Sequence, residues 1–127
     1  MRTYKTLLFF LISLVLLASC AANEPQVAVV EAYLEGIVSQ DDIAVTNFSC
    51  SDWEFNALLE LDSFLAVSPQ LKDLQCAVTG SDEQSTFVNC TGAIIATYND
   101  EQQELDLSVR TYRVIEEAGE WVVCGYQ

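Results

Sequence analysis

The chain has 127 residues, in which 19 Asp and Glu outnumber 5 Lys and Arg, and it contains no histidine. A surface so rich in carboxylates repels phosphate backbones, which argues against nucleic acid as a partner. The absence of histidine removes the commonest general base and the commonest transition-metal ligand. The composition therefore excludes triad hydrolases and zinc sites built on histidine.

The first 20 residues have the layout of a bacterial secretion signal. Two cations, Arg2 and Lys5, precede an uncharged apolar run over residues 7–17. This run is shorter than the roughly 20 residues that a membrane-spanning helix needs. It ends in Leu17-Ala18-Ser19-Cys20, which resembles the lipobox of bacterial lipoproteins.

In lipoproteins the signal peptide is cut just before a cysteine that carries lipid. The resemblance implies a signal peptide over residues 1–19, a lipidated tether over 20–24 and one domain over 25–127. It also implies an extracytoplasmic location at the cell membrane or envelope, with Cys20 as the lipid anchor. The alternative is an ordinary signal peptide whose cysteine is incidental.

Four cysteines follow Cys20, an even number in a chain expected to leave the reducing cytosol. Four cysteines allow three connectivities, and the local pattern favours one of them. Cys76 and Cys90 flank a polar turn symmetrically and are expected to face each other across a hairpin, which leaves Cys50 to pair with Cys124. A four-thiolate metal site needs close C-x-x-C pairs, which are absent, so no metal and no cofactor are expected.

Three helices are expected first. Apolar residues recur at helical spacing from Pro25 to about Val38, and Asp41-Asp42 is expected to cap a short helical turn. The third helix is expected to begin with Ser51-Asp52-Trp53-Glu54 as a capping box, in which Ser51 and Glu54 each satisfy a backbone donor. It is expected to run until Ser68-Pro69 stops it.

After Pro69 the apolar period changes to two, which predicts four strands. Short turns between them predict an antiparallel meander, and Gly92 predicts a bulge or bend in the second strand. The fold class is therefore α+β, with the N-terminal helices packed in the concave face of a curved four-stranded antiparallel sheet. The predicted strands cover residues 71–79, 86–98, 103–115 and 120–126.

This order of elements resembles the cystatin-like cone of the nuclear transport factor 2-like superfamily, in particular its lumazine-binding-like lipoprotein branch. The opening helix around Val30-Glu31-Ala32-Tyr33-Leu34 and the closing strand from Gly119 to Tyr126 carry the resemblance. The superfamily includes ketosteroid isomerase-like enzymes, dehydratases and small-ligand binders. The fold alone therefore leaves the function open.

Asp62 is the one acid that interrupts an apolar helical face, and we expect it to project into the cone. A carboxylate there can transfer protons, with Tyr33, Tyr98 or Tyr112 as partners for an oxyanion. The alternative is a boundary position, solvated or paired with Arg110 or Arg113. The candidate residues for lining a pocket are Tyr33, Trp53, Tyr98, Arg110, Tyr112 and Trp121, together with Tyr126.

The sequence thus predicts a non-enzymatic, lipid-anchored module. It is expected to bind a small molecule in its cone, or another envelope protein through its sheet, and a homodimer through the sheet is expected to be possible. The alternative is an enzyme of isomerase or dehydratase type that uses Asp62. An inward-facing Arg110 would require a carboxylate, from Asp62 or from an anionic ligand.

Overall fold

The computed structural model describes residues 24–127. The predicted signal peptide and the predicted lipidation site Cys20 lie outside the described residues, so both stay predictions. Within the described part of the chain, no helix is long and apolar enough to cross a membrane.

The first two helices follow from local sequence. α2 (Pro25–Ser39) has proline in its first turn, where the missing N–H is no loss, and ends at Gln40 with a left-handed φ of 58°. α3 (Asp42–Asn47) is capped by Asp41, whose carboxylate accepts a hydrogen bond from the Ala44 N–H at 3.0 Å. Both helices were expected at these positions.

α4 (Glu54–Ser63) exists, but both of its ends differ from the prediction. The capping box is wrong, because the backbone N–H and the hydroxyl of Ser51 both donate to the Glu117 carboxylate, 66 residues away. α4 therefore starts at Glu54 without a side-chain cap. It also ends before Ser68-Pro69, where the Gln40 side-chain amide donates to the carbonyls of Phe64 and Val67.

One antiparallel sheet follows, in the order β1-β2-β4-β5, with β3 also paired to β2. The predicted continuous strand over 103–115 is wrong in one respect, because that segment is divided into two strands and the sheet has five strands. The Asp106 carboxylate accepts from the Ser108 N–H and starts a short 3-10 turn, η2 (Leu107–Val109), which buries Leu107. The strands are β1 (Ser68–Ser81), β2 (Thr86–Tyr98), β3 (Glu101–Asp106), β4 (Thr111–Glu117) and β5 (Glu120–Tyr126).

The predicted bend at Gly92 is confirmed. Gly92 has a φ of +97°, and a Cβ atom there would lie 2.5 Å from the Lys72 carbonyl oxygen. The register of β1 against β2 shifts between Lys72 and Gln75, where Asp73 has a φ of 53°. This bulge curves the long pair of strands toward the helices.

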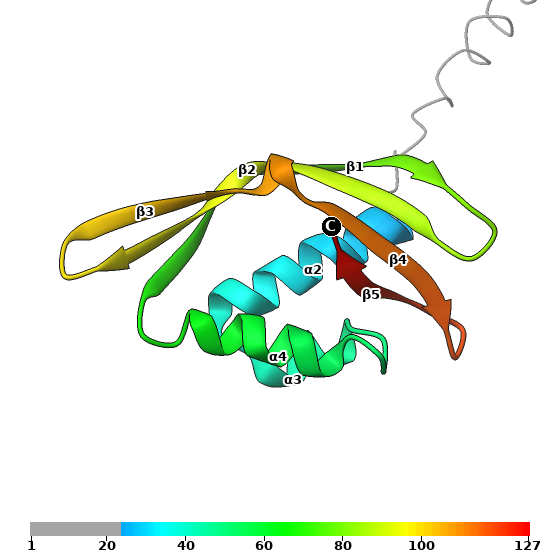
Figure 1. The fold of residues 1–127 in the computed structure, drawn as a ribbon, viewed down its shortest axis with the longest axis horizontal. Helices are drawn as coiled ribbons and strands as arrows, with labels where there is room; N and C mark the ends of the chain where they lie inside the picture. The colour runs from blue at the N-terminus through cyan, green and yellow to red at the C-terminus, as the bar shows by residue number, and fades with distance from the viewer. Residues whose placement is uncertain (1–23) are drawn as a thin grey trace, which may run out of the picture.

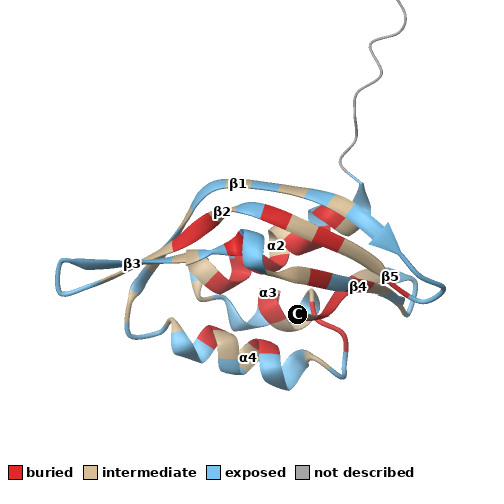
Figure 2. Ribbon diagram, turned by 45° about the horizontal axis from the view of Figure 1, so that its top comes forward, coloured by how far each residue is buried: buried red, intermediate tan, exposed pale blue. Residues whose placement is uncertain are grey.

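The curved sheet lies over the three helices, which pack on its concave side (Figure 1). Figure 2 shows that the buried residues lie on α2 and on the strands above it. The largest fully buried side chains include Tyr33 and Leu34 of α2 and Tyr112 and Val114 of β4. The α+β class and the packing of helices into a concave sheet are confirmed.

Both favoured disulfides are confirmed: Cys76–Cys90 joins β1 to β2, and Cys50–Cys124 joins the segment before α4 to β5. Beside the second bridge, the Cys50 N–H donates to the Val123 carbonyl and the Val123 N–H donates to the Phe48 carbonyl, both at 2.8 Å. The edge of β5 is thereby covered. Two disulfides indicate a protein that folds in an oxidising, extracytoplasmic environment.

Candidate functional site at the cone mouth

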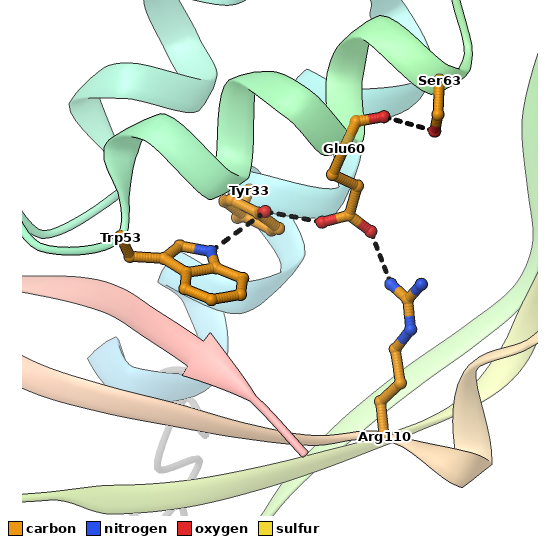
Figure 3. Close-up of polar contacts among 5 residues, drawn as sticks. All are labelled: Tyr33, Trp53, Glu60, Ser63 and Arg110. Atoms are coloured by element: carbon orange, nitrogen blue, oxygen red, sulfur yellow. Dashed lines mark hydrogen bonds and ion pairs between the residues drawn. The ribbon is translucent and has the colours of Figure 1, made fainter.

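The interior of the cone holds a closed polar network centred on Glu60 of α4 (Figure 3). The Tyr33 hydroxyl donates to Oε2 of Glu60 at 2.7 Å, and Nη1 of Arg110 donates to Oε1 at 2.6 Å. The side chains of Arg110 and Glu60 are only 14% and 7% exposed. Trp53 adds a longer contact, from its indole N–H to the Tyr33 hydroxyl at 3.4 Å. Both oxygens of the carboxylate are therefore occupied.

The rotation of α4 about its own axis decides which acidic side chain faces the interior of the cone. Ala57 and Leu61 are buried, and Glu60 lies on the same side of the helix because it follows Ala57 by three residues. Asp62 lies on the outer side and is exposed. The prediction that Asp62 projects into the cone is therefore wrong, and it does not pair with arginine among the described residues.

Aromatic rings surround the arginine of the network. The Arg110 guanidinium carbon lies 4.1 Å from the centre of the Tyr126 ring, a cation–π contact. Tyr112 packs edge-on against Tyr126 and Tyr33, with ring centres 5.6 Å and 6.4 Å apart. The Tyr112 hydroxyl is buried, and no hydrogen-bond partner for it lies among the described residues.

The electrostatics raise the pKa values of the buried tyrosines and of the arginine in this network. Burial raises the pKa of Tyr112 to about 12, against a smaller lowering by Arg110. Burial and then the negative charge of Glu60 raise the pKa of Tyr33 further. Burial opposes the charge on Arg110, but the negative charge of the Glu60 carboxylate and the hydrogen bond to it favour the charged form, and the pKa of Arg110 is raised. The tyrosines therefore stay neutral and the arginine stays charged.

An open hollow of about 410 Å³ lies beside this network. Trp53 and Tyr126 belong to both, because each ring contacts the network and also lines the hollow. Gly125 has a φ of +117°, and a Cβ there would lie 3.5 Å from the Trp53 ring. The hollow is lined by Trp53, Phe87, Thr111, Arg113, Cys124, Gly125, Tyr126 and Gln127.

Arg113 is the cation of the hollow. Its guanidinium donates to the Ser85 hydroxyl at 3.3 Å, and no carboxylate within residues 24–127 forms an ion pair with it. A cation left without a carboxylate in so acidic a chain can take an anion from solution. The hollow therefore offers one positive group beside three aromatic rings.

The candidate pocket residues separate into two groups. Tyr33, Trp53, Arg110 and Tyr112 come together in the cone, as does Tyr126. Tyr98 is 58% exposed at the end of β2, and Trp121 lines a different groove near the start of α2. Among residues 24–127, no group of three or more Cys, Asp or Glu is placed to hold a metal ion.

Sequence reasoning missed Glu60 and Phe87. Glu60 stands in the run Leu58-Leu59-Glu60-Leu61, where apolar residues on both sides of the helix leave the phase undecided. The available signal was Arg110, since a buried guanidinium requires a carboxylate. That requirement is met by Glu60 instead of by Asp62.

Comparisons with known proteins identify the fold but no close relative. No known family profile matches the chain, and no curated protein sequence matches it. A crystal structure described as "a putative ketosteroid isomerase" from Shewanella frigidimarina is similar, with 12% identity and a TM-score of 0.56 over 82% of this chain and 94% of that one.

Two further structures share the architecture. One is a protein from Rhodopseudomonas palustris that contains a SEC-C motif, with 7% identity and a TM-score of 0.57 over 79% of this chain and 75% of that one. The other is the helical cell shape determining protein Pgp2 from Campylobacter jejuni, with 12% identity and a TM-score of 0.52 over 79% of this chain and 38% of that one. At these identities the similarity shows the fold alone, which is a set of helices in the concave face of a curved antiparallel sheet.

Proposed function

We propose that this chain is a non-enzymatic, lipid-anchored extracytoplasmic module that binds a small flat anion in the open hollow lined by Arg113 and three aromatic rings. The observation that carries the proposal is that the carboxylate of Glu60 is fully engaged by hydrogen bonds within the protein. Its two oxygens accept hydrogen bonds from Tyr33 and Arg110, so the buried acid is engaged by the protein itself.

A proton-transfer enzyme needs a carboxylate that reaches its substrate. Glu60 is 7% exposed and is held by a charged donor, and Asp62 lies outside the cone. An isomerase activity of the kind named for the Shewanella protein would require the Arg110 pair to open. The geometry favours binding over catalysis.

The hollow has the dimensions and chemistry of a small-molecule site. Its volume of about 410 Å³ falls within the range of roughly 300–1,000 Å³ typical of ligand pockets. Phe87, Trp53 and Tyr126 offer ring faces and edges to a flat molecule. Arg113 offers donors that match a carboxylate. The fitting ligand is a flat molecule with one carboxylate.

The anchor is supported by the order of charge, apolar run and lipobox before Cys20, and by the two disulfides. Two or three acyl chains make such a tether durable, because each buried methylene contributes about 0.8 kcal/mol. The test is labelling of the cells with a radioactive fatty acid. Label on the wild type and none on C20A supports the anchor, whereas label on neither form overturns it.

Binding is tested with residues 21–127 produced in an oxidising compartment and screened against flat carboxylic acids by thermal unfolding. A ligand at about 100 times its Kd stabilises by about 2.7 kcal/mol, which raises Tm by roughly 10 °C for a domain of this size. R113Q is expected to weaken binding by about 10- to 100-fold, because it removes a charge-assisted hydrogen bond.

K72Q is the matched control, since it removes an exposed positive charge from β1, away from the hollow. Equal weakening by K72Q and R113Q would show attraction by net charge and not a site. Turnover of a bound compound that E60Q abolishes would replace the proposal with the enzyme. A screen in which no flat carboxylate shifts Tm would overturn the binding role.

A second candidate function is self-association, which was expected through the sheet. The exposed large apolar side chains point instead to α4, where Phe55 is 71% and Leu59 is 52% exposed one helical turn apart. Light scattering of the domain at high concentration tests it. If the protein is a dimer and F55S/L59S makes it monomeric, the contact lies on α4. If the wild type is a monomer at all concentrations, self-association is excluded.

A further inference from the structure

A second, more apolar hollow lies where α2 begins. Its volume is about 420 Å³. Its walls come from the first two turns of α2, from the end of α3 and from the turn between β4 and β5, and we call it the α2 groove. The α2 groove is lined by Pro25, Ala28, Val29, Ala32, Asn47, Phe48, Gly119, Glu120 and Trp121.

The groove lies close to the predicted anchor along the chain. Pro25 is five residues after Cys20. A fully extended chain covers at most about 3.6 Å per residue, so the lipidated cysteine lies no more than about 18 Å from the start of α2. The headgroup layer of one leaflet is about 5–8 Å thick, the difference between the whole bilayer and its hydrocarbon core. The tether therefore holds the first turn of α2 near the lipid surface.

The exposed chemistry of the α2 groove suits that surface. Trp121 is half-buried, with its ring lining the groove, and Phe48 is half-buried beside it. Tryptophan favours the membrane interface, because its ring is apolar while its N–H bonds to headgroups. None of the three basic residues of the described chain lines this groove, so any attraction to lipid is apolar and not electrostatic.

Acidic residues limit which lipid the groove can meet. Glu120 lines the groove, and a neighbouring hollow that shares Trp121 is lined by Asp82, Glu83 and Glu116. These carboxylates repel anionic headgroups. A zwitterionic surface carries no net charge and does not oppose them.

We propose that the α2 groove docks on the zwitterionic lipid interface of the anchoring membrane, with Trp121 inserted among the headgroups. This inference rests on the proposed lipid anchor. It orients the domain, because the hairpin of β2 and β3 lies at the opposite end of the molecule from the start of α2 (Figure 1). The α2 groove is then the surface of the domain that contacts the membrane.

The chain supplies its own probes, since Trp53 and Trp121 are its two tryptophans. The full-length lipidated protein is reconstituted into phosphatidylcholine vesicles whose acyl chains carry bromine, a contact quencher of tryptophan fluorescence. W53F leaves Trp121 as the reporter, and W121F leaves Trp53. We expect quenching of Trp121 at least twofold stronger than that of Trp53, and weaker quenching of Trp121 when anionic lipid is added.

A28E tests the groove without removing a buried group, because Ala28 is exposed and lines it. S39E, at the exposed far end of α2, is the matched control. In the W53F background, A28E is expected to reduce the quenching of Trp121 by at least twofold, and S39E is expected to leave it unchanged.

The outcomes separate the two proposals. Protein that fails to float with the vesicles contradicts the anchor, and the docking falls with it. Protein that floats while Trp121 and Trp53 are quenched equally keeps the anchor and overturns the docking. Equal effects of A28E and S39E also overturn it, since they would reflect net charge and not the groove.

Discussion

At the scale of single residues, the ion pair of Glu60 and Arg110 is the most consequential contact in the cone. Two largely buried charges neutralise each other, and removal of one leaves the other without a partner in a poorly solvated place. A buried ion pair contributes little net free energy to folding, but removal of one partner alone is strongly destabilising. The pair therefore fixes the position of α4 against the residue that joins η2 to β4.

E60A is expected to lower the free energy of unfolding by about 3 kcal/mol, because Arg110 stays buried without its carboxylate. D62A, two residues away on the exposed side of the same helix, is the matched control and is expected to change it by less than about 0.5 kcal/mol. Urea unfolding followed by circular dichroism measures both. A D62A effect as large as that of E60A would mean that α4 has the opposite phase.

The two buried tyrosines of the network are expected to respond oppositely to loss of the hydroxyl. Y33F deprives Glu60 of a hydrogen bond and is expected to cost about 1–3 kcal/mol. Y112F removes a buried hydroxyl without a protein partner and is expected to be neutral or stabilising by up to about 1 kcal/mol. Chemical denaturation of the two variants decides it, and a clear loss in Y112F would reveal a partner such as a bound water.

Tyr112 also predicts an alkaline limit to stability. Its pKa is about 12 in the folded protein and about 10 in an unfolded chain. Because the folded state disfavours the tyrosinate, ionisation of Tyr112 leaves stability unchanged below pH 10 and lowers it between about pH 10 and 12. Unfolding free energies measured from pH 8 to 12 should fall less steeply in Y112F than in wild type. If the unfolding free energies of Y112F and wild type fall in parallel with pH, Tyr112 does not cause the alkaline loss of stability.

At the scale of elements, β2 and β5 were predicted with their observed bounds because each is a run of alternating residues between clear turn signals. The two ends of α4 differ from the predicted bounds because side chains distant in sequence bind the backbone or side chain there. Glu117 takes the hydrogen bonds of Ser51 that a capping box would use, and Gln40 bonds the carbonyls after α4. Apolar residues lie on both sides of α4, so the local sequence does not show which side of the helix faces the cone. The sequence therefore predicts Asp62 in the cone, whereas the structure places Glu60 there.

The bend at Gly92 gives the prediction for the sheet. G92A is expected to cost about 3 kcal/mol or more, because it combines a positive φ with a contact of 2.5 Å to backbone. G80A, in the neighbouring strand, has no atom within 4 Å of its added Cβ and is expected to change stability by less than about 1 kcal/mol. Thermal unfolding compares them, and equal losses would refute a special role for the bend.

At the scale of the whole molecule, the Cys50–Cys124 bridge joins the helical half to the last strand. Its cysteines are 74 residues apart in sequence, against 14 for Cys76–Cys90. Restriction of the unfolded chain grows with loop length, to about 4 kcal/mol for the long loop and about 3 kcal/mol for the short one. The long bridge also lies next to Trp53 in the apolar cluster of Cys50, Val122 and Cys124.

C50A/C124A is therefore expected to lose about 1 kcal/mol more stability than C76A/C90A, and to lose more of the ligand response of the Arg113 hollow, since Cys124 lines that hollow and Cys90 does not. Urea unfolding gives the first comparison, and ligand-induced Tm shifts give the second. If Cys76–Cys90 proves the more stabilising bridge, the link between β1 and β2 contributes more to the stability of the fold than the link between the helices and β5. If both double variants lose equal stability but only C50A/C124A loses the ligand response, the long bridge shapes the Arg113 hollow more than it stabilises the chain.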